Sequence, residues 1–257
     1  MVFLGTGTSH GVPMIGCECA VCRSTDPRDK RLRPSIYVDV PSHARLLVDA
    51  GTDLRQQALT NGVTRIDAIL LTHAHADHIL GLDEIRRFNA MSGGPIPCYA
   101  NESTWENVRR TFHYIFDGKP RQGGGIPKLD PRVIDGPLTI GGVRVVPVPV
   151  WHGGMPVLGF RFGDFAYLTD CNRIDDSSMA LVAGVDTLVI DALRERPHAT
   201  HFSVAEALEV IVRVSPRRAY MTHMTHDLGH QATSARLPGG VELAYDGLVL
   251  DVRVDVE

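Results

Sequence analysis

The sequence has no hydrophobic run long enough to cross a membrane. No stretch holds the roughly 18 uninterrupted apolar residues that a spanning helix needs. The first residues, MVFLGTGTSHGVPM, also lack the basic start and the long apolar stretch of a secretory signal peptide. We therefore expect a cytoplasmic protein with no membrane partner.

A strong charge of either sign is also missing. The net charge is −4, from 26 basic and 30 acidic residues. A chain so weakly charged has no general electrostatic attraction to nucleic acid, so neither RNA nor DNA is an expected partner. No repeat or long linker divides the 257 residues, of which 44% are hydrophobic. A single domain over residues 1–257 is therefore expected.

Cysteine is too scarce for a disulfide scaffold, since the chain has five. Three of them, Cys17, Cys19 and Cys22, lie in the stretch GCECAVC. In a reducing compartment such a cluster is more often a metal site, but a closed tetrahedral zinc site needs a fourth ligand. Cys98 and Cys171 stand alone and are expected to be buried as small apolar residues.

Apolar or alternating runs predict many strands, and amphipathic stretches between them predict helices. Strands are expected at 1–7, 35–40, 44–51, 68–73, 96–100, 143–150, 157–162, 165–170, 187–192, 218–223 and 247–252. Helices are expected at 52–62, 79–91, 103–116 and 203–214. This order favours two sheets with helices outside them. The Gly/Pro-rich stretch 118–136 is either a substrate loop or a plain surface loop.

Ligand-type residues are concentrated in LLTHAHADHILGLDEI, where an apolar strand runs into a helical pattern. Residues two apart on an extended backbone point the same way, so His73 and His75 can hold one ion. Asp77 and His78 follow where the helix begins and aim at a displaced point, as a second ion requires.

Three later apolar runs also end in ligand-type residues, namely His152, Asp170 and His223. Strand ends at one sheet edge cluster in space, so these residues are expected to complete the ion site. Together with HAHADH, they make the chain resemble the metallo-β-lactamase superfamily. That resemblance implies an α/β, four-layer αββα sandwich with two mixed β-sheets and a dinuclear metal site between the sheet edges.

The resemblance also implies a ligand set. One ion would be held by His73, His75 and His152, the other by Asp77, His78 and His223, with Asp170 bridging the two. Asp77 is counted among the catalytic residues as well. Ligand type fits either Zn²⁺ or Mn²⁺. Cys171, next to Asp170, is left without a role.

The opening FLGTGTSHGVPMIGCECAVC and the later MTHMTHD narrow the resemblance to the PhnP family of phosphoribosyl cyclic phosphate phosphodiesterases. This likeness implies a small phosphodiester substrate, either a ribose 1,2-cyclic phosphate or a 2′,3′-cyclic nucleotide. It favours Mn²⁺ for activity, suggests a homodimer, and places His226 as the fourth ligand of a structural Zn²⁺ with Cys17, Cys19 and Cys22. His230 is the rival fourth ligand.

A proton donor is expected in ERPHATHFSVAEAL. Ser203 and Glu206 form a capping-box pattern, so His201 lies just before a helix N-terminus, where negative charge is stabilised. The PhnP-like enzymes use a histidine in this region as a general acid, and His201 is the match. His198 is the alternative proton donor. In a purely structural interpretation, both histidines belong only to a capping turn.

The glycine-rich stretch GTGTSHG, residues 5–11, is not a phosphate-binding P-loop, because it lacks the Gly-Lys-Ser/Thr ending. We interpret it as a tight turn near the metals, with His10 at most a supporting residue. Two other functions remain open: a tRNA 3′-processing endonuclease, and a non-catalytic role in cofactor biosynthesis or metal binding.

Overall fold

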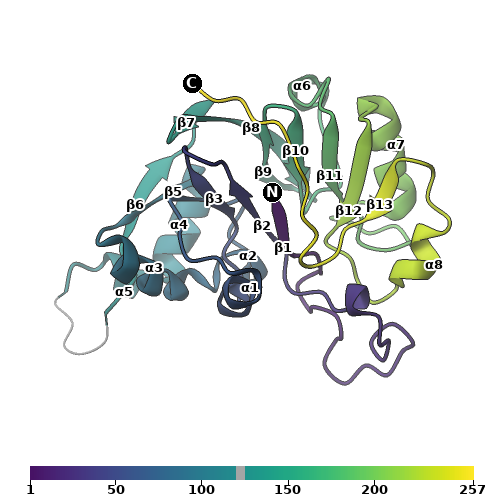
Figure 1. Cartoon of the computed structure of the whole chain (residues 1–257), viewed down its shortest axis with the longest axis horizontal. Coiled ribbons are helices and arrows are strands. Elements are labelled where there is room, and N and C mark those ends of the chain that lie inside the picture. Colours follow the sequence, from purple (N-terminus) through teal and green to yellow (C-terminus); the bar gives the residue numbers. More distant parts are fainter. Residues whose placement is uncertain (120–124) are drawn as a thin grey trace.

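Two β-sheets face one another in the computed structural model, and helices cover their outer faces (Figure 1). The structure describes residues 1–119 and 125–257. The first sheet has six strands in the order β1-β2-β3-β4-β5-β6, and the second has seven in the order β13-β12-β11-β10-β9-β8-β7. The expected αββα sandwich of two mixed sheets is confirmed.

The strands of the first sheet are β1 (Val2–Gly5), β2 (Ser35–Asp39), β3 (Arg45–Val48), β4 (Ala68–Leu70), β5 (Ile96–Ala100) and β6 (Leu129–Val133). Those of the second sheet are β7 (Leu138–Ile140), β8 (Val143–His152), β9 (Met155–Phe162), β10 (Phe165–Leu168), β11 (Thr187–Asp191), β12 (Arg218–Thr222) and β13 (Val241–Leu243). The strands from β3 to β6 pair in parallel, as do those from β10 to β13.

The described α-helices are α1 (Leu54–Asn61), α2 (Ala76–Ile79), α3 (Ile85–Ser92), α4 (Glu102–Thr111), α5 (His113–Phe116), α6 (Asp176–Leu181), α7 (Val204–Val214) and α8 (His230–Ser234). The short 3₁₀ helices η1 (Pro27–Asp29) and η2 (Leu82–Glu84) complete the helical elements of this part of the chain.

Three apolar clusters separate the four layers. Leu46 of β3 points into the cluster between the sheets, whereas the next residue, Leu47, points outward under α1, α3 and α4. In β11, Val189 lies between the sheets and Ile190 packs in the outer cluster with α7. Because successive side chains of a strand alternate, strands covered on both faces read as continuous apolar runs.

The structure departs from the predicted elements in several places. The helix expected at 79–91 is divided into the end of α2, η2 and α3, and no prediction covered β7, β13, α6 or α8. The helix expected at 103–116 breaks at Phe112, whose φ of −108° and ψ of 42° are not helical. The run 247–252 is no regular strand, although Phe3 N–H donates to the Leu248 carbonyl at 2.9 Å. Part of the expected 118–136 loop is edge strand β6, paired with β5. Residues 120–124 of that loop lie outside the described part of the chain.

Candidate metal centre and active site

The site lies where strands of both sheets end. His73 follows β4, His152 ends β8, Asp170 follows β10 and His223 follows β12. Since β8 is antiparallel to β9, and β9 to β10, the last residues of β8, β10 and β12 meet at one edge. Asp170 and His223 have positive φ, 53° and 61°, which is uncommon for residues with a side chain. Such backbone strain is tolerated chiefly at functional sites.

The HAHADH segment supplies the remaining side chains from one short stretch. His75 lies immediately before α2, in extended conformation with φ −67° and ψ 154°. The first turn of α2 then carries Asp77 and His78, which are buried, whereas His75 is exposed. The change from extended chain to helix therefore aims the two halves of the segment at neighbouring points.

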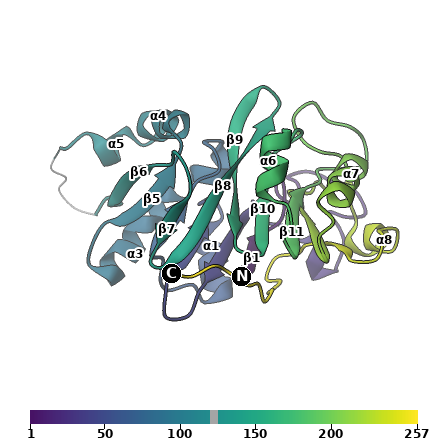
Figure 2. The ribbon, with the colours of Figure 1, turned by 90° about the horizontal axis from the view of Figure 1, so that it is seen from above.

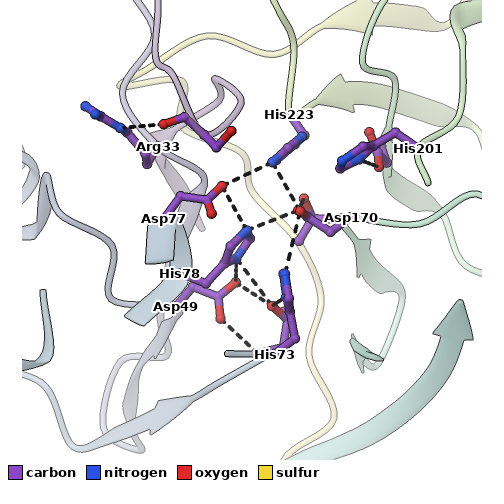
Figure 3. A network of polar contacts seen from close by, with 12 residues as sticks. Arg33, Asp49, His73, Asp77, His78, Asp170, His201 and His223 are labelled. Carbon is purple, nitrogen blue, oxygen red and sulfur yellow. Dashed lines mark hydrogen bonds and ion pairs between the residues drawn. The ribbon is translucent and has the colours of Figure 1, made fainter. Parts of the chain in front are cut away.

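Two clusters result, and they share Asp170. Within each cluster the ligand atoms lie within 4.8 Å of one another. The first consists of His73, His75, His152 and Asp170, and the second of Asp77, His78, Asp170 and His223. Figure 3 shows the Asp170 carboxylate between His73, His78 and His223. All seven side chains expected as ligands are thus brought together, in the two groups expected.

Unsatisfied nitrogen atoms indicate that these clusters fit metal ions. The Nε2 atoms of His73, His78 and His223 are buried without a hydrogen-bond partner in the described part of the chain. Nε2 of His78 and Nε2 of His223 each lie 3.2 Å from an Asp170 oxygen. Buried polar atoms are normally satisfied, and a divalent cation between these nitrogens and oxygens would satisfy them.

Three of the histidines, His73, His78 and His152, are held through their Nδ1 atoms from outside the clusters. Nδ1 of His78 lies 2.7 Å from an Asp49 oxygen, and Nδ1 of His152 donates to the Thr200 carbonyl at 2.8 Å. Nδ1 of His73 lies 3.0 Å from the Thr72 hydroxyl, which donates to Asp49. Partners on Nδ1 orient the rings so that Nε2 faces the ion, as in histidine-ligated metal sites generally.

The protonation states of the histidines differ between the two clusters. Burial lowers the pKa of His73, His75 and His152, so these rings are neutral and have a lone pair to offer. Burial alone would lower the pKa of His223, but Asp170 and Asp77 outweigh it and raise the pKa to about 9. Without an ion, His223 therefore carries a proton that a bound metal has to displace.

His201 lies at one flank of the clusters. Its ring is 4.5 Å from His152 and 4.7 Å from His223, between ring centroids. Its Nδ1 lies 2.7 Å from an oxygen of Asp191, which is fully buried. His198, the alternative, lies 5.3 Å from His201, and its Nδ1 accepts from the Thr200 N–H at 3.3 Å. Of the two histidines, His201 is therefore the one that contacts the rings of the clusters and is held by a buried carboxylate.

The sequence patterns did not identify Asp49 and Asp191 as residues that support the site. Each stands at the end of an apolar run, in LLVDAG and LVIDA, which is the pattern that singled out Asp170. Applying that pattern to every strand would have found both. Their partners, His78 and His201, could not have been named, because these contacts span 29 and 10 residues and depend on the packing of strands.

The cysteine cluster is a separate candidate metal site. Cys17 Sγ and Cys19 Sγ each lie 3.3 Å from Nδ1 of His226, and Cys22 completes the group. His230 lies elsewhere, its ring 5.7 Å from that of Tyr245. The structure therefore assembles the Cys₃His set with His226, and not with the rival His230.

The remaining expectations concern buried cysteines and the glycine-rich turn. Cys98 and Cys171 are fully buried, as predicted. A Cβ at Gly5 would lie 2.0 Å from the Arg33 carbonyl oxygen, so this glycine permits close approach of two chain segments. His10 is exposed.

No helix within residues 1–119 and 125–257 is long and apolar enough to cross a membrane.

Comparison with known proteins agrees with this geometry. Residues 44–224 match the family described as the Beta-lactamase superfamily domain, and the chain belongs to the metallo-β-lactamase superfamily. Over its full length the chain is similar to a solved structure described as a new diphosphatase from the PhnP family. The TM-score is 0.92 with 42% identity, covering 100% of this chain and 98% of the other.

Two curated relatives carry other names. The Octanoyltransferase of Porphyromonas gingivalis is 35% identical over 249 residues, which are 96% of this chain and 50% of that protein. The chain therefore spans half the length of this relative. Coenzyme PQQ synthesis protein B of Methylobacterium radiotolerans is 30% identical over 226 residues, covering 74% of this chain and 72% of that protein.

Proposed function

We propose that this chain hydrolyses small cyclic phosphodiesters, a ribose 1,2-cyclic phosphate or a 2′,3′-cyclic nucleotide, to a monophosphate. The observation that supports it is the pair of His/Asp clusters sharing Asp170, with the His201–Asp191 pair beside them. Two divalent ions held there, Mn²⁺ or Zn²⁺, would supply the Lewis acidity that neutralises a phosphate and acidifies a water.

The residues of the chain supply the proton and orient the group that donates it. In the reaction, a water loses one proton to solvent as its oxygen bonds to phosphorus. One ring P–O bond breaks, and the departing oxygen takes up a proton from His201, which regains one from solvent. His201 gives that proton from Nε2, because Nδ1 is committed to Asp191. The Asp191 carboxylate stabilises the imidazolium before transfer, and the leaving group departs as an alcohol. A positioned general acid typically contributes about 10²–10⁴-fold.

A second candidate, hydrolysis of a diphosphate linkage, is favoured by one specific observation. The solved relative that is 42% identical over the whole chain is described as a diphosphatase. A diphosphate also presents an anionic phosphorus centre and an oxygen leaving group, so the same clusters and His201 serve it.

A substrate panel tests the proposal. The panel holds ribose 1,2-cyclic phosphate, 2′,3′-cyclic nucleotides, 3′,5′-cyclic nucleotides, nucleoside diphosphates, linear aryl diesters and a precursor tRNA. Each is assayed with Mn²⁺ and with Zn²⁺. We expect monophosphate from the five-membered cyclic diesters, abolished by a chelator. Turnover of diphosphates alone would favour the second candidate, and faster 3′ cleavage of precursor tRNA would establish RNA processing instead.

We further propose that Cys17, Cys19, Cys22 and His226 bind one structural Zn²⁺. Four protein ligands leave no open position for a substrate, which is typical of structural zinc. The ion would join the amino-terminal loop to the segment that follows β12, and that segment also carries His223.

A further inference from the structure

A small pocket of about 200 Å³ opens beside the first His/Asp cluster. His73 and His75 form one wall, Ser103 and Asn107 of α4 a second, and Met155 and Pro156 at the start of β9 a third. In Figure 2, α4 and the β8–β9 hairpin lie at the same end of the molecule. An occupant of this pocket therefore lies next to the clusters without occupying them.

We propose that this pocket binds the base of a nucleoside, so that the substrate is a nucleotide and not a bare ribose phosphate. The inference rests on the proposed function for the location of the phosphate. At about 200 Å³ the pocket is smaller than the roughly 300–1,000 Å³ of sites for whole drug-sized ligands, so it suits one ring system.

The walls have the two surfaces that a base needs. Met155 and Pro156 offer apolar contact to the face of a ring, and methionine adapts its shape to an occupant. Ser103 and Asn107 provide polar groups along another wall. A ligand with flat apolar faces and a polar edge, as a nucleobase has, matches this division.

Asn107 has hydrogen-bonding capacity left for a ligand. Its Nδ2 donates to the Ser103 carbonyl at 2.8 Å, and its Oδ1 accepts from Arg110. A side-chain amide has two donor hydrogens and two acceptor lone pairs, so one donor and one acceptor remain among the contacts of residues 1–119 and 125–257. A neighbouring donor and acceptor are what an asparagine uses to pair with the edge of adenine.

The pocket is separated from the proton donor. Ring contacts run from His75 to His152 at 5.1 Å, and from His152 to His201 at 4.5 Å, between centroids. His152 thus stands between the pocket wall and His201. Changes in the pocket are therefore expected to alter substrate binding more than proton transfer, which is a change in KM more than in kcat.

Asn107→Ala tests the proposal, with Asn61→Ala as the matched control. Asn61 lies on α1 and makes the same kind of bond, from Nδ2 to the Gln57 carbonyl four residues earlier, at 2.9 Å. The substrates are adenosine 2′,3′-cyclic monophosphate and ribose 1,2-cyclic phosphate. We expect Asn107→Ala to raise KM for the nucleotide about tenfold, with little change for the ribose substrate, and Asn61→Ala to change neither.

Three outcomes would overturn the pocket assignment. The first is equal kcat/KM of the wild type on both substrates, and the second is an equal effect of Asn107→Ala on both. If no cyclic diester is hydrolysed, the proposed function fails, and calorimetry then tests the pocket separately with adenosine monophosphate. Weaker binding by Asn107→Ala and Met155→Ala than by Asn61→Ala supports the pocket, and equal binding is the third outcome that overturns it.

Discussion

One carboxylate oxygen of Asp191 contacts both the His201 ring and the backbone next to Asp170. Its Oδ2 lies 2.7 Å from Nδ1 of His201 and accepts the Cys171 N–H at 2.8 Å. Because Cys171 directly follows Asp170, this carboxylate fixes His201, the proposed proton donor, relative to the shared carboxylate of the two clusters. Asp191 is a positioning residue, since it acts through its neighbours.

Asp191→Asn is expected to lower kcat on substrates with an alkoxide leaving group. The loss should be at least about tenfold and at most the roughly 10²–10⁴-fold that a general acid contributes. The amide no longer stabilises the His201 imidazolium. An aryl diester, whose leaving group needs no proton, should lose much less. The measurement is kcat against leaving-group pKa, and His198→Ala serves as the control with little effect. Equal losses on both substrates would contradict the role.

Cys19→Ala should remove about one zinc per chain and leave the two active-site ions in place. A hydrogen bond from the Cys22 N–H, followed by one from His226, lowers the pKa of Cys19 to about 6. The thiolate is therefore present at neutral pH and ready to bind a metal. Metal analysis checks the result, with Cys98→Ala as the control that retains all zinc. Unchanged zinc in Cys19→Ala would leave the cluster as ordinary thiols.

Asp246 should give stability a pH dependence. Burial raises the pKa of this carboxyl to about 7, although the Leu32 N–H and the Thr6 hydroxyl donate to it, both at 2.7 Å. The unfolded value is about 3.9. Between about pH 4 and 7 the folded chain thus holds one proton more than the unfolded chain, so this carboxyl makes stability fall as pH rises.

Urea unfolding of the wild type and Asp246→Asn across this range measures the effect. The wild type should lose stability relative to the variant as pH rises from about 4 to 7, and the difference should be constant above the folded pKa. Parallel profiles of the two proteins across the whole range would show that Asp246 does not titrate in this way.

Arg31→Met should destabilise the fold strongly. The Arg31 guanidinium is fully buried, and it donates to the carbonyls of Thr225 at 2.8 Å and Leu228 at 2.5 Å. It also pairs with Asp29 at 3.4 Å. Removing one partner of a buried ion pair leaves the other uncompensated, so the free energy of unfolding should fall by about 3–5 kcal/mol.

The control is Arg23→Met. Arg23 pairs with Glu18 at 2.9 Å, but both side chains are mostly exposed. Such a surface pair is worth about 0–1 kcal/mol, so little change in the unfolding free energy is expected. Similar losses in the two variants would show that burial does not distinguish the Arg31 pair.

Local sequence patterns predicted most helices and strands and the candidate residues of the site. They gave wrong predictions where contacts between distant segments determine the local structure. The continuous apolar run at 187–192 predicts β11 because both its faces are buried. At Phe112, whose side chain is buried, the backbone leaves the helical conformation, and the periodicity of the sequence does not predict this break. Likewise, Val2 pairs with Val249 by a single bridge, so the apolar run there forms no strand.

The order of residues along the chain was sufficient to single out the candidate ligands, and the resemblance added how they group. In HAHADH, the spacing and the change from strand to helix are local, so they can be interpreted without knowledge of the fold. The same holds for the three cysteines within GCECAVC. Both features depend on neighbours in sequence, and the resemblance to a known superfamily rests on them.

The folded chain alone decided which partners these residues have. Asp49 behind His78, Asp191 behind His201, and the pocket between α4 and the β8–β9 hairpin are contacts of separate segments. His226 also joins cysteines 204 or more positions away in the sequence. The resemblance implied this partner, and the structure decided between it and His230. Such contacts arise when strand ends of two sheets meet at one edge, and their geometry depends on how the layers pack.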